Sequence, residues 1–146
     1  MAEKIEHDPD LRRNAEATRR LEALVARIEE ADLARSLGGG WTVGFALAHL
    51  AFWDARQYFA LQSYARGDDF PPEDKTVNDT LKAVAPIFRA SSAGREAVRA
   101  AQLVDATVAA LSAEQHASLA QNGLSFAVRR WPHRDEHVAQ IAAALS

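Results

Sequence analysis

Apolar side chains recur at helical spacing through most of this chain, and that spacing restricts it to a helical fold. In the first segment, the apolar positions repeat every three or four residues: Leu11, Ala15, Thr18, Leu21, Leu24, Val25 and Ile28. Alanine dominates the apolar set, whereas β-branched and aromatic residues are sparse. Alanine is the strongest helix former, and strands prefer the residues that are sparse here. No alternating run is long enough to predict a strand.

Capping and helix-stopping residues divide the chain into helices. A first helix is predicted from Asp8 as N-cap, with Pro9 at its first position, until the glycines at 38–40 end the segment. A second is predicted from Thr42 to about Arg66. A loop over 68–75 follows, and then a helical region over 77–88 that Pro86 kinks or ends. The next helix is capped by Ser91 and Ser92 and runs to about Leu111. A short helix is opened by a capping box at Ser112–Gln115 and ended by Asn122–Gly123, and a last helix runs from Pro132 to about Leu145. These elements predict a single all-α domain over 1–146, a four-helix bundle with a long loop after the second helix and a kinked or broken third helix region.

The composition excludes several classes of protein. The chain has 146 residues and no cysteine, so a disulfide framework, a thiolate nucleophile and a cysteine-based zinc site are excluded. A net charge of -3 provides no basic field for nucleic acid or an anionic membrane. Residues 1–11 lack the apolar run of a signal peptide, and the apolar stretch over 45–53 is too short to span a bilayer. We therefore expect a cytoplasmic protein with a small-molecule substrate and no nucleic-acid or membrane partner.

Three histidines form a candidate metal site. His133 and His137 are four residues apart near the start of a helix, a spacing that aims two imidazoles the same way. His49 lies in the middle of the most apolar helix, where a buried imidazole needs a hydrogen-bond partner or a metal. Helix bundles build metal sites from inward ligands on facing helices, and three ligands leave a position open for water or substrate. The alternatives are two exposed polar residues on the last helix and a hydrogen-bonded core histidine at position 49.

Two segments resemble the DinB-like superfamily of metal-binding four-helix bundles. GGGWTVGFALAHLAFWD, over 38–54, is similar to the entry to that family's second helix, and HRDEHVAQI, over 133–141, is similar to its closing helix. The resemblance covers nearly the whole chain and implies a metal triad of His49, His133 and His137. The superfamily includes thiol-dependent S-transferases and isomerases, metal-dependent hydrolases and many members without known activity. Because the chain ends right after its last helix, we do not expect the additional C-terminal domain of mycothiol-dependent maleylpyruvate isomerases, whose N-terminal domain is of this type.

Other side chains are candidates for roles around the histidines. Arg56 shares a helix face with His49 and Trp53, where it could meet an anionic substrate; the alternative is an arginine at the bundle edge that packs through its stem. Glu136 flanks the paired histidines with Gln140 and could orient a ligand or act as a base, or it is a solvated helix residue.

The remaining aromatic and histidine residues carry weaker signals. Trp41 and Trp131 precede the two histidine-bearing helices and are interpreted as core residues; the alternative is that they cover the site. His7 and His116 fall on polar positions, and we assign them no function.

Three functions are compatible with these patterns. The first is a metal-dependent enzyme that uses one divalent ion (Zn, Ni or Fe) for thiol transfer or for hydrolysis by metal-activated water. The thiol would come from a low-molecular-weight cofactor, since the chain has no cysteine. The second is a non-catalytic stress-related or ligand-binding bundle with a structural or absent metal, and the third is a pure interaction bundle. A homodimer is expected from the apolar second helix.

Overall fold

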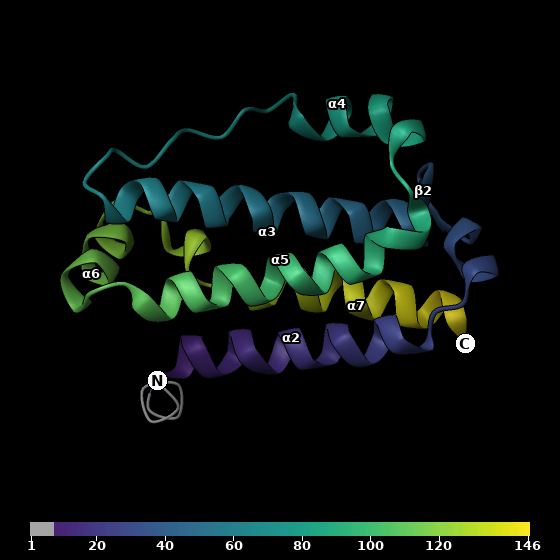
Figure 1. Cartoon of the computed structure of the whole chain (residues 1–146), viewed down its shortest axis with the longest axis horizontal. Helices are drawn as coiled ribbons and strands as arrows, with labels where there is room; N and C mark the ends of the chain where they lie inside the picture. Colours follow the sequence, from purple (N-terminus) through teal and green to yellow (C-terminus); the bar gives the residue numbers. More distant parts are fainter. Residues whose placement is uncertain (1–7) are drawn as a thin grey trace.

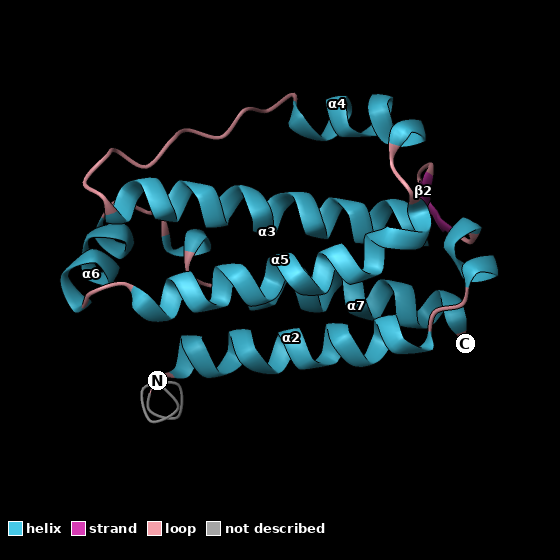
Figure 2. Cartoon of the chain, in the orientation of Figure 1, coloured by secondary structure: helices cyan, strands magenta, loops and turns pink. Residues whose placement is uncertain are grey.

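Four long helices form the frame of the protein in the computed structural model, which describes residues 8–146 (Figures 1 and 2). They are α2 (Pro9–Arg27), α3 (Val43–Ala65), α5 (Ala90–Ala110) and α7 (Trp131–Leu145). Shorter helical pieces complete the chain: α4 (Val77–Val84), α6 (Ala113–Gln121) and 3-10 turns at Glu30–Ala34, Ala85–Ile87 and Ser125–Ala127. The all-α bundle and its broken third helical region are confirmed. Within the described residues, no helix is both long and apolar enough to cross a membrane.

A long crossover between α3 and α5 sets the direction in which α5 runs. The segment after α3 and then α4 run back along the outside of α3, so α5 starts at the end of the bundle where α3 started (Figure 1). As a result α3 and α5 run parallel, while α2 and α7 run in the opposite direction (Figure 1). Bundles with such a crossover differ from simple up-and-down bundles in which every neighbour is antiparallel.

Local capping explains where several helices begin. The Asp8 carboxylate accepts hydrogen bonds from the backbone N–H groups of Asp10 and Leu11 at 2.9 and 3.2 Å. The Thr42 hydroxyl accepts from the N–H of Phe45 at 3.1 Å, which fixes the start of α3 close to His49. Both caps satisfy donors that the first helical turn leaves free, as the sequence predicted.

The prediction that the first helical segment extends to the glycines was wrong. Helix α2 ends at Arg27, and the chain continues through a 3-10 turn into a small antiparallel hairpin of β1 (Ser36–Gly38) and β2 (Trp41–Thr42). The glycines at 38, 39 and 40 have φ values of 89°, 61° and 81°. Three successive residues in the left-handed region need glycine, so this run makes the hairpin turn instead of ending a helix.

Two other helix starts differ by one or two residues from their prediction. Helix α5 begins at Ala90 with Arg89 as N-cap, so Ser91 and Ser92 lie in its first turn and do not cap it. Helix α7 begins at Trp131, one residue before Pro132, because the carbonyl of Arg130 already accepts a helical hydrogen bond from Arg134.

A polar layer separates two apolar clusters in the core. One cluster lies toward the hairpin: Leu21, Leu24, Val43, Ala46, Leu47, Leu50, Ala93, Ala97, Ala101 and Ile141. The other lies toward α6: Leu11, Leu61, Val104, Val108, Ala109, Leu111, Leu119, Ala127 and Val128. The buried polar residues between them include Asn14, Thr18, Asp54, Arg130 and Arg134. Polar groups at this depth must be hydrogen-bonded to one another.

Candidate metal centre

The three predicted histidines converge between α3 and α7. The Nε2 atoms of His49 and His133 are 2.9 Å apart, although 84 residues separate them in the chain. The ring centroids of all three pairs lie 5.0 Å apart. One nitrogen from each imidazole lies within 4.8 Å of the others, so His49, His133 and His137 could hold a single metal ion.

Each histidine is placed by its helix. His49 follows the Thr42 cap of α3 by two turns and is buried. His133 and His137 lie one turn apart on α7, with Pro132 in its first turn. This i, i+4 spacing puts both rings on the helix face that meets His49.

Burial keeps His49 and His133 neutral. Burial, and after it the neighbouring His137, lowers the pKa of His49 to about 4. Burial also lowers the pKa of His133 to about 3, with Arg130 as the next-largest cause. A neutral imidazole is the form that binds metal, so neither ring needs to lose a proton first at neutral pH.

The hydrogen bond at His137 is the kind that orients a metal ligand. Nδ1 of His137 lies 3.1 Å from Oε1 of Gln140, so Nδ1–H donates to the amide oxygen and Nε2 is left as an electron-pair donor. Nδ1 of His49 and of His133 is buried without a hydrogen-bond partner. Two nitrogens that bind one ion at about 2.0–2.1 Å are about 3.3 Å apart in tetrahedral geometry and about 2.9 Å apart where the ligand angle is near 90°, as in octahedral geometry. The His49–His133 separation therefore suits two ligands of one ion, and the donor set fits the metal that the sequence predicted.

Tryptophan side chains cover the cluster. The Trp41 ring stacks on His137 with centroids 5.7 Å apart, and its centroid is 4.9 Å from that of His49. Trp53 approaches His49 from the next turn of α3, at 6.4 Å between centroids. Only 6% of His49 and 9% of His137 is exposed, whereas His133 is half-buried. Access to the three nitrogens is therefore narrow.

A buried network of charged residues adjoins the cluster. Asp54 accepts a hydrogen bond from Nε of Arg130 at 2.9 Å and from Nε of Arg134 at 2.8 Å. The far side of the Arg134 guanidinium donates to Asp105 at 2.8 Å and to the hydroxyl of Thr18 at 2.9 Å. The two arginines and two aspartates balance in charge, which permits their burial.

A comparison with protein families agrees with this architecture. A family model of the DinB superfamily matches residues 13–145, which is most of the chain. The chain belongs to the DinB superfamily. No curated protein and no solved structure gives a significant match.

The other candidates predicted in this DinB superfamily member lie in different surroundings. Arg56 donates to the backbone carbonyls of Pro71 and Pro72 at 2.8 and 2.9 Å, and its guanidinium lies 5.4 Å from the ring centre of Phe70. Its donors therefore hold the loop that follows α3. Glu136 is exposed on α7.

The remaining aromatic and histidine candidates lie outside the cluster or beside it. Trp41 is part of the cover described above, whereas Trp131 is half-buried under the guanidinium of Arg13, 5.0 Å from its ring centre. His116 lies 3.1 Å from the carbonyl of Val108, where it joins α6 to α5. His7 lies outside the described residues.

Sequence reasoning missed the charged network, although a signal was present. Asp54 is the first charged residue of α3, after eleven uncharged positions. The argument that an isolated polar residue on an apolar helix needs a partner was applied to His49 and holds equally for Asp54. Arg134 lies between the paired histidines and precedes Ile141 by seven residues, a spacing that places it on the inward face.

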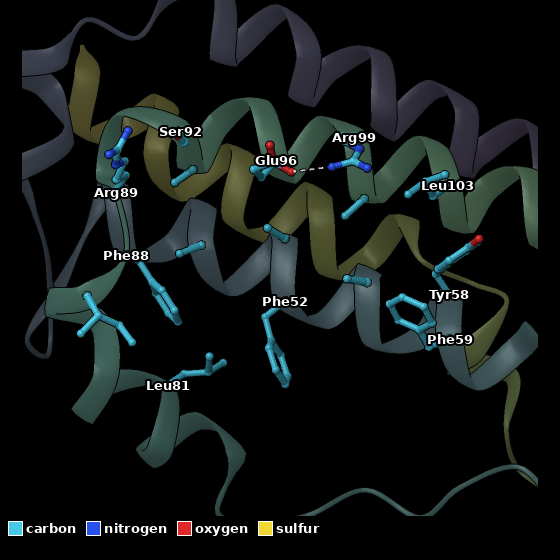
Figure 3. Close-up of a pocket in the computed structure, with 16 residues that line it drawn as sticks. Phe52, Tyr58, Phe59, Leu81, Phe88, Arg89, Ser92, Glu96, Arg99 and Leu103 are labelled. Carbon is cyan, nitrogen blue, oxygen red and sulfur yellow. Dashed lines mark hydrogen bonds and ion pairs between the residues drawn. The ribbon is translucent and has the colours of Figure 1, made fainter. Parts of the chain in front are cut away.

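A large apolar groove of the DinB bundle lies away from the histidines. It has a volume of about 850 Å³ and runs between α3 and α5 beside α4 (Figure 3). Alanines of α3 and α5 are among its lining residues, and Phe52, Phe59, Leu81 and Phe88 lie around it (Figure 3). None of the three histidines lines it.

Proposed function

We propose that this protein is a divalent-metal-dependent enzyme whose centre consists of His49, His133 and His137. The observation that supports the proposal most strongly is the convergence of three imidazole nitrogens within 4.8 Å. Three protein ligands are the number typical of catalytic metal sites, where a further position stays open. Imidazole ligands suit zinc, nickel and iron.

The donor set supports chemistry on an anionic nucleophile. All three ligands are neutral, so they leave the double positive charge of a divalent ion uncompensated. Such an ion lowers the pKa of a water or a thiol that binds beside the histidines. Thiol transfer to an electrophile and hydrolysis are therefore the two reaction classes proposed.

The chain's own residues supply the surroundings. No cysteine is present, so the thiol of a transfer reaction comes from a low-molecular-weight cofactor. Gln140 holds the tautomer of His137, and Trp41 and Trp53 restrict water around the rings. Glu136 is proposed as the base, since it is exposed on the histidine-bearing helix. Arg56 could bind a substrate anion only by exchanging a contact with the loop carbonyls.

A second candidate is a non-catalytic bundle with a structural metal. The low exposure of His49 and His137, at 6% and 9%, favours it. A structural ion needs no open path, whereas a substrate has to reach the metal. The two candidates share the same ligands and differ in whether a small molecule reaches them.

Elemental analysis of untagged protein tests the proposal. We expect about one zinc, nickel or iron ion per chain in the wild type and loss of that ion in His49→Ala, His133→Ala and His137→Ala. His116→Ala, which removes a histidine outside the cluster, is the matched control and should retain the ion. Metal-free wild type after incubation with all three metals would contradict the site.

Activity then separates the two candidates. The metal-loaded protein is assayed with thiol–electrophile pairs and with ester, amide and phosphoester substrates. Turnover that disappears in the three histidine variants and persists in His116→Ala supports the enzyme. Full metal occupancy without turnover, together with failure of small anions to perturb the spectrum of bound Co²⁺, supports the structural metal.

A further inference from the structure

Asp54 joins the two arginines that lie on either side of His133. Its Oδ1 accepts from Nε of Arg130 at 2.9 Å and its Oδ2 accepts from Nε of Arg134 at 2.8 Å. Asp54 and Arg134 are fully buried, and Arg130 is 5% exposed. Each carboxylate oxygen is thus used by a different arginine, one at the N-cap of α7 and one within that helix.

The bonds between Asp54 and the two arginines connect the same two helices that carry the histidine cluster. Asp54 and His49 are five residues apart on α3, and Arg130 and Arg134 lie on the same helix as His133 and His137 or at its start. The helices α3 and α7 run antiparallel (Figure 1). A contact that fixes how far one helix is shifted along the other therefore also fixes the relative height of His49 and the two histidines of α7. A shift of one residue along a helix is about 1.5 Å, enough to separate nitrogens that must share one metal ion.

The charges around His133 also support a role for Asp54 at the metal site. Arg130 lies about one helical turn before His133, and its Nε donates to Oδ1 of Asp54 at 2.9 Å. An arginine without a partner would repel a cation bound at His133. The carboxylate of Asp54 therefore both aligns the two helices and neutralises the arginine closest to the site.

Asp105 offers a comparison within the same network. It accepts from Arg134 at 2.8 Å and from Thr18 at 2.5 Å, but it lies on α5 and contacts the far side of the guanidinium. It does not bridge α3 to α7. Loss of its charge should weaken the fold without moving His49 relative to His133.

We propose that Asp54 is a positioning residue of the metal centre, which sets the α3–α7 register and offsets the charge of Arg130 so that His49, His133 and His137 bind one divalent ion. The inference rests on the proposed metal site and adds a residue that does not itself contact the ion.

The test compares Asp54→Asn with Asp105→Asn. Zinc affinity is measured by calorimetric titration of metal-free protein, and the free energy of unfolding by urea denaturation. We expect Asp54→Asn to bind zinc about 10–100-fold more weakly, the range found when residues that orient metal ligands are removed. Asp105→Asn should lose stability but stay within about twofold of the wild-type zinc affinity, because it leaves both bonds between Asp54 and the arginines in place.

The visible spectrum of bound Co²⁺ adds a readout that stability alone does not change. We expect an altered ligand-field spectrum in Asp54→Asn and a wild-type spectrum in Asp105→Asn. Equal losses of affinity in both variants, or wild-type affinity and spectrum in Asp54→Asn, would overturn the inference and leave the proposed metal site intact. A wild-type protein that binds none of zinc, nickel and iron would overturn both.

Asp54→Glu covers the outcome in which Asp54→Asn does not fold. Glutamate keeps the charge but displaces the carboxylate by one methylene, so it does not meet both Nε atoms at the original helix spacing. We expect zinc affinity about tenfold below wild type. Wild-type affinity and an unchanged Co²⁺ spectrum in Asp54→Glu would overturn the positioning role.

Discussion

The indole of Trp41 lies parallel to the imidazole of His137, with 7° between their planes and 5.7 Å between their centroids. The hairpin at residues 36–42 presents Trp41 to the histidines, immediately before α3 begins. The same ring makes a T-shaped contact with His49. One aromatic side chain therefore covers ligands from two different helices.

Replacing Trp41 with alanine should open the site. We expect Trp41→Ala to lower the free energy of unfolding by about 1–3 kcal/mol, since part of its apolar surface is buried. Transfer of bound zinc to a chelator should become faster, because the rings of His49 and His137 become exposed. Stopped-flow measurement with a chromogenic chelator follows the transfer. Tyr64→Ala, a half-buried aromatic in the other cluster, is the control, and equal acceleration in both variants would contradict the covering role.

Removing the amide of Gln140 should weaken metal binding without a comparable effect on the fold. Gln140 is exposed, but its Oε1 accepts from Nδ1–H of His137 at 3.1 Å. We expect Gln140→Ala to bind zinc about tenfold more weakly and to change the unfolding free energy by less than about 0.5 kcal/mol. Calorimetric titration measures the affinity. Gln102→Ala, at an exposed position on α5, should behave as wild type, and a wild-type affinity in Gln140→Ala would refute the orienting hydrogen bond.

The metal-free protein should lose stability as the pH falls. The pKa values of His49 and His133 are about 4 and about 3 in the folded state, against about 6.5 in an unfolded chain. Between pH ~6.5 and ~5 the unfolded state binds protons that the folded state does not, so the unfolding free energy decreases on acidification. Each histidine contributes a slope of up to about 1.4 kcal/mol per pH unit.

Urea denaturation in the presence of a chelator, repeated from pH 7 to pH 5, measures that slope. His49→Gln should remove about half of it, whereas Gln102→Ala, which removes no titratable group, should leave it unchanged. A slope that is identical in both variants would show that other groups cause the pH dependence.

Two ion pairs of similar geometry but different burial should differ in how much their loss lowers the free energy of unfolding. Arg134 and Asp54 are 2.8 Å apart and fully buried, whereas Arg20 and Asp135 are 2.8 Å apart with 49% and 34% of their side chains exposed. We expect Arg134→Met to cost about 3–5 kcal/mol, because it leaves buried carboxylates without a partner. Arg20→Met should cost at most about 1 kcal/mol. Urea denaturation measures both, and similar losses would contradict the role of burial.

The features that could be predicted from the sequence, such as the helix caps and the shared face of His133 and His137, are those that depend on local signals. Asp8 and Thr42 cap helices because their side chains accept from backbone groups two or three residues away. The spacing of His133 and His137 placed both rings on one face, and His49 was expected to meet them because it lies on an apolar helix. These arguments needed only helix geometry and the cost of burying a polar group.

The parts that sequence reasoning missed depend on contacts between distant segments. No glycine or proline marks the end of α2 at Arg27, so local residues gave no reason to end it before Gly38. Asp54 and Arg134 are 80 residues apart, and their pairing follows from the register of two helices. Burial of Trp41 against His137 likewise needs the hairpin, which the spacing of apolar residues does not predict.

The parallel arrangement of α3 and α5 has a consequence for how quickly the chain folds. These two helices are the most extensively packed pair in the bundle, yet no tight turn connects them. Their pairing has to wait until the crossover over 66–89 closes as a loop, which carries an entropy cost before the apolar faces meet. Folding should therefore be slower than in an up-and-down bundle of equal length, and a shortened crossover would strain the native pairing instead of accelerating it.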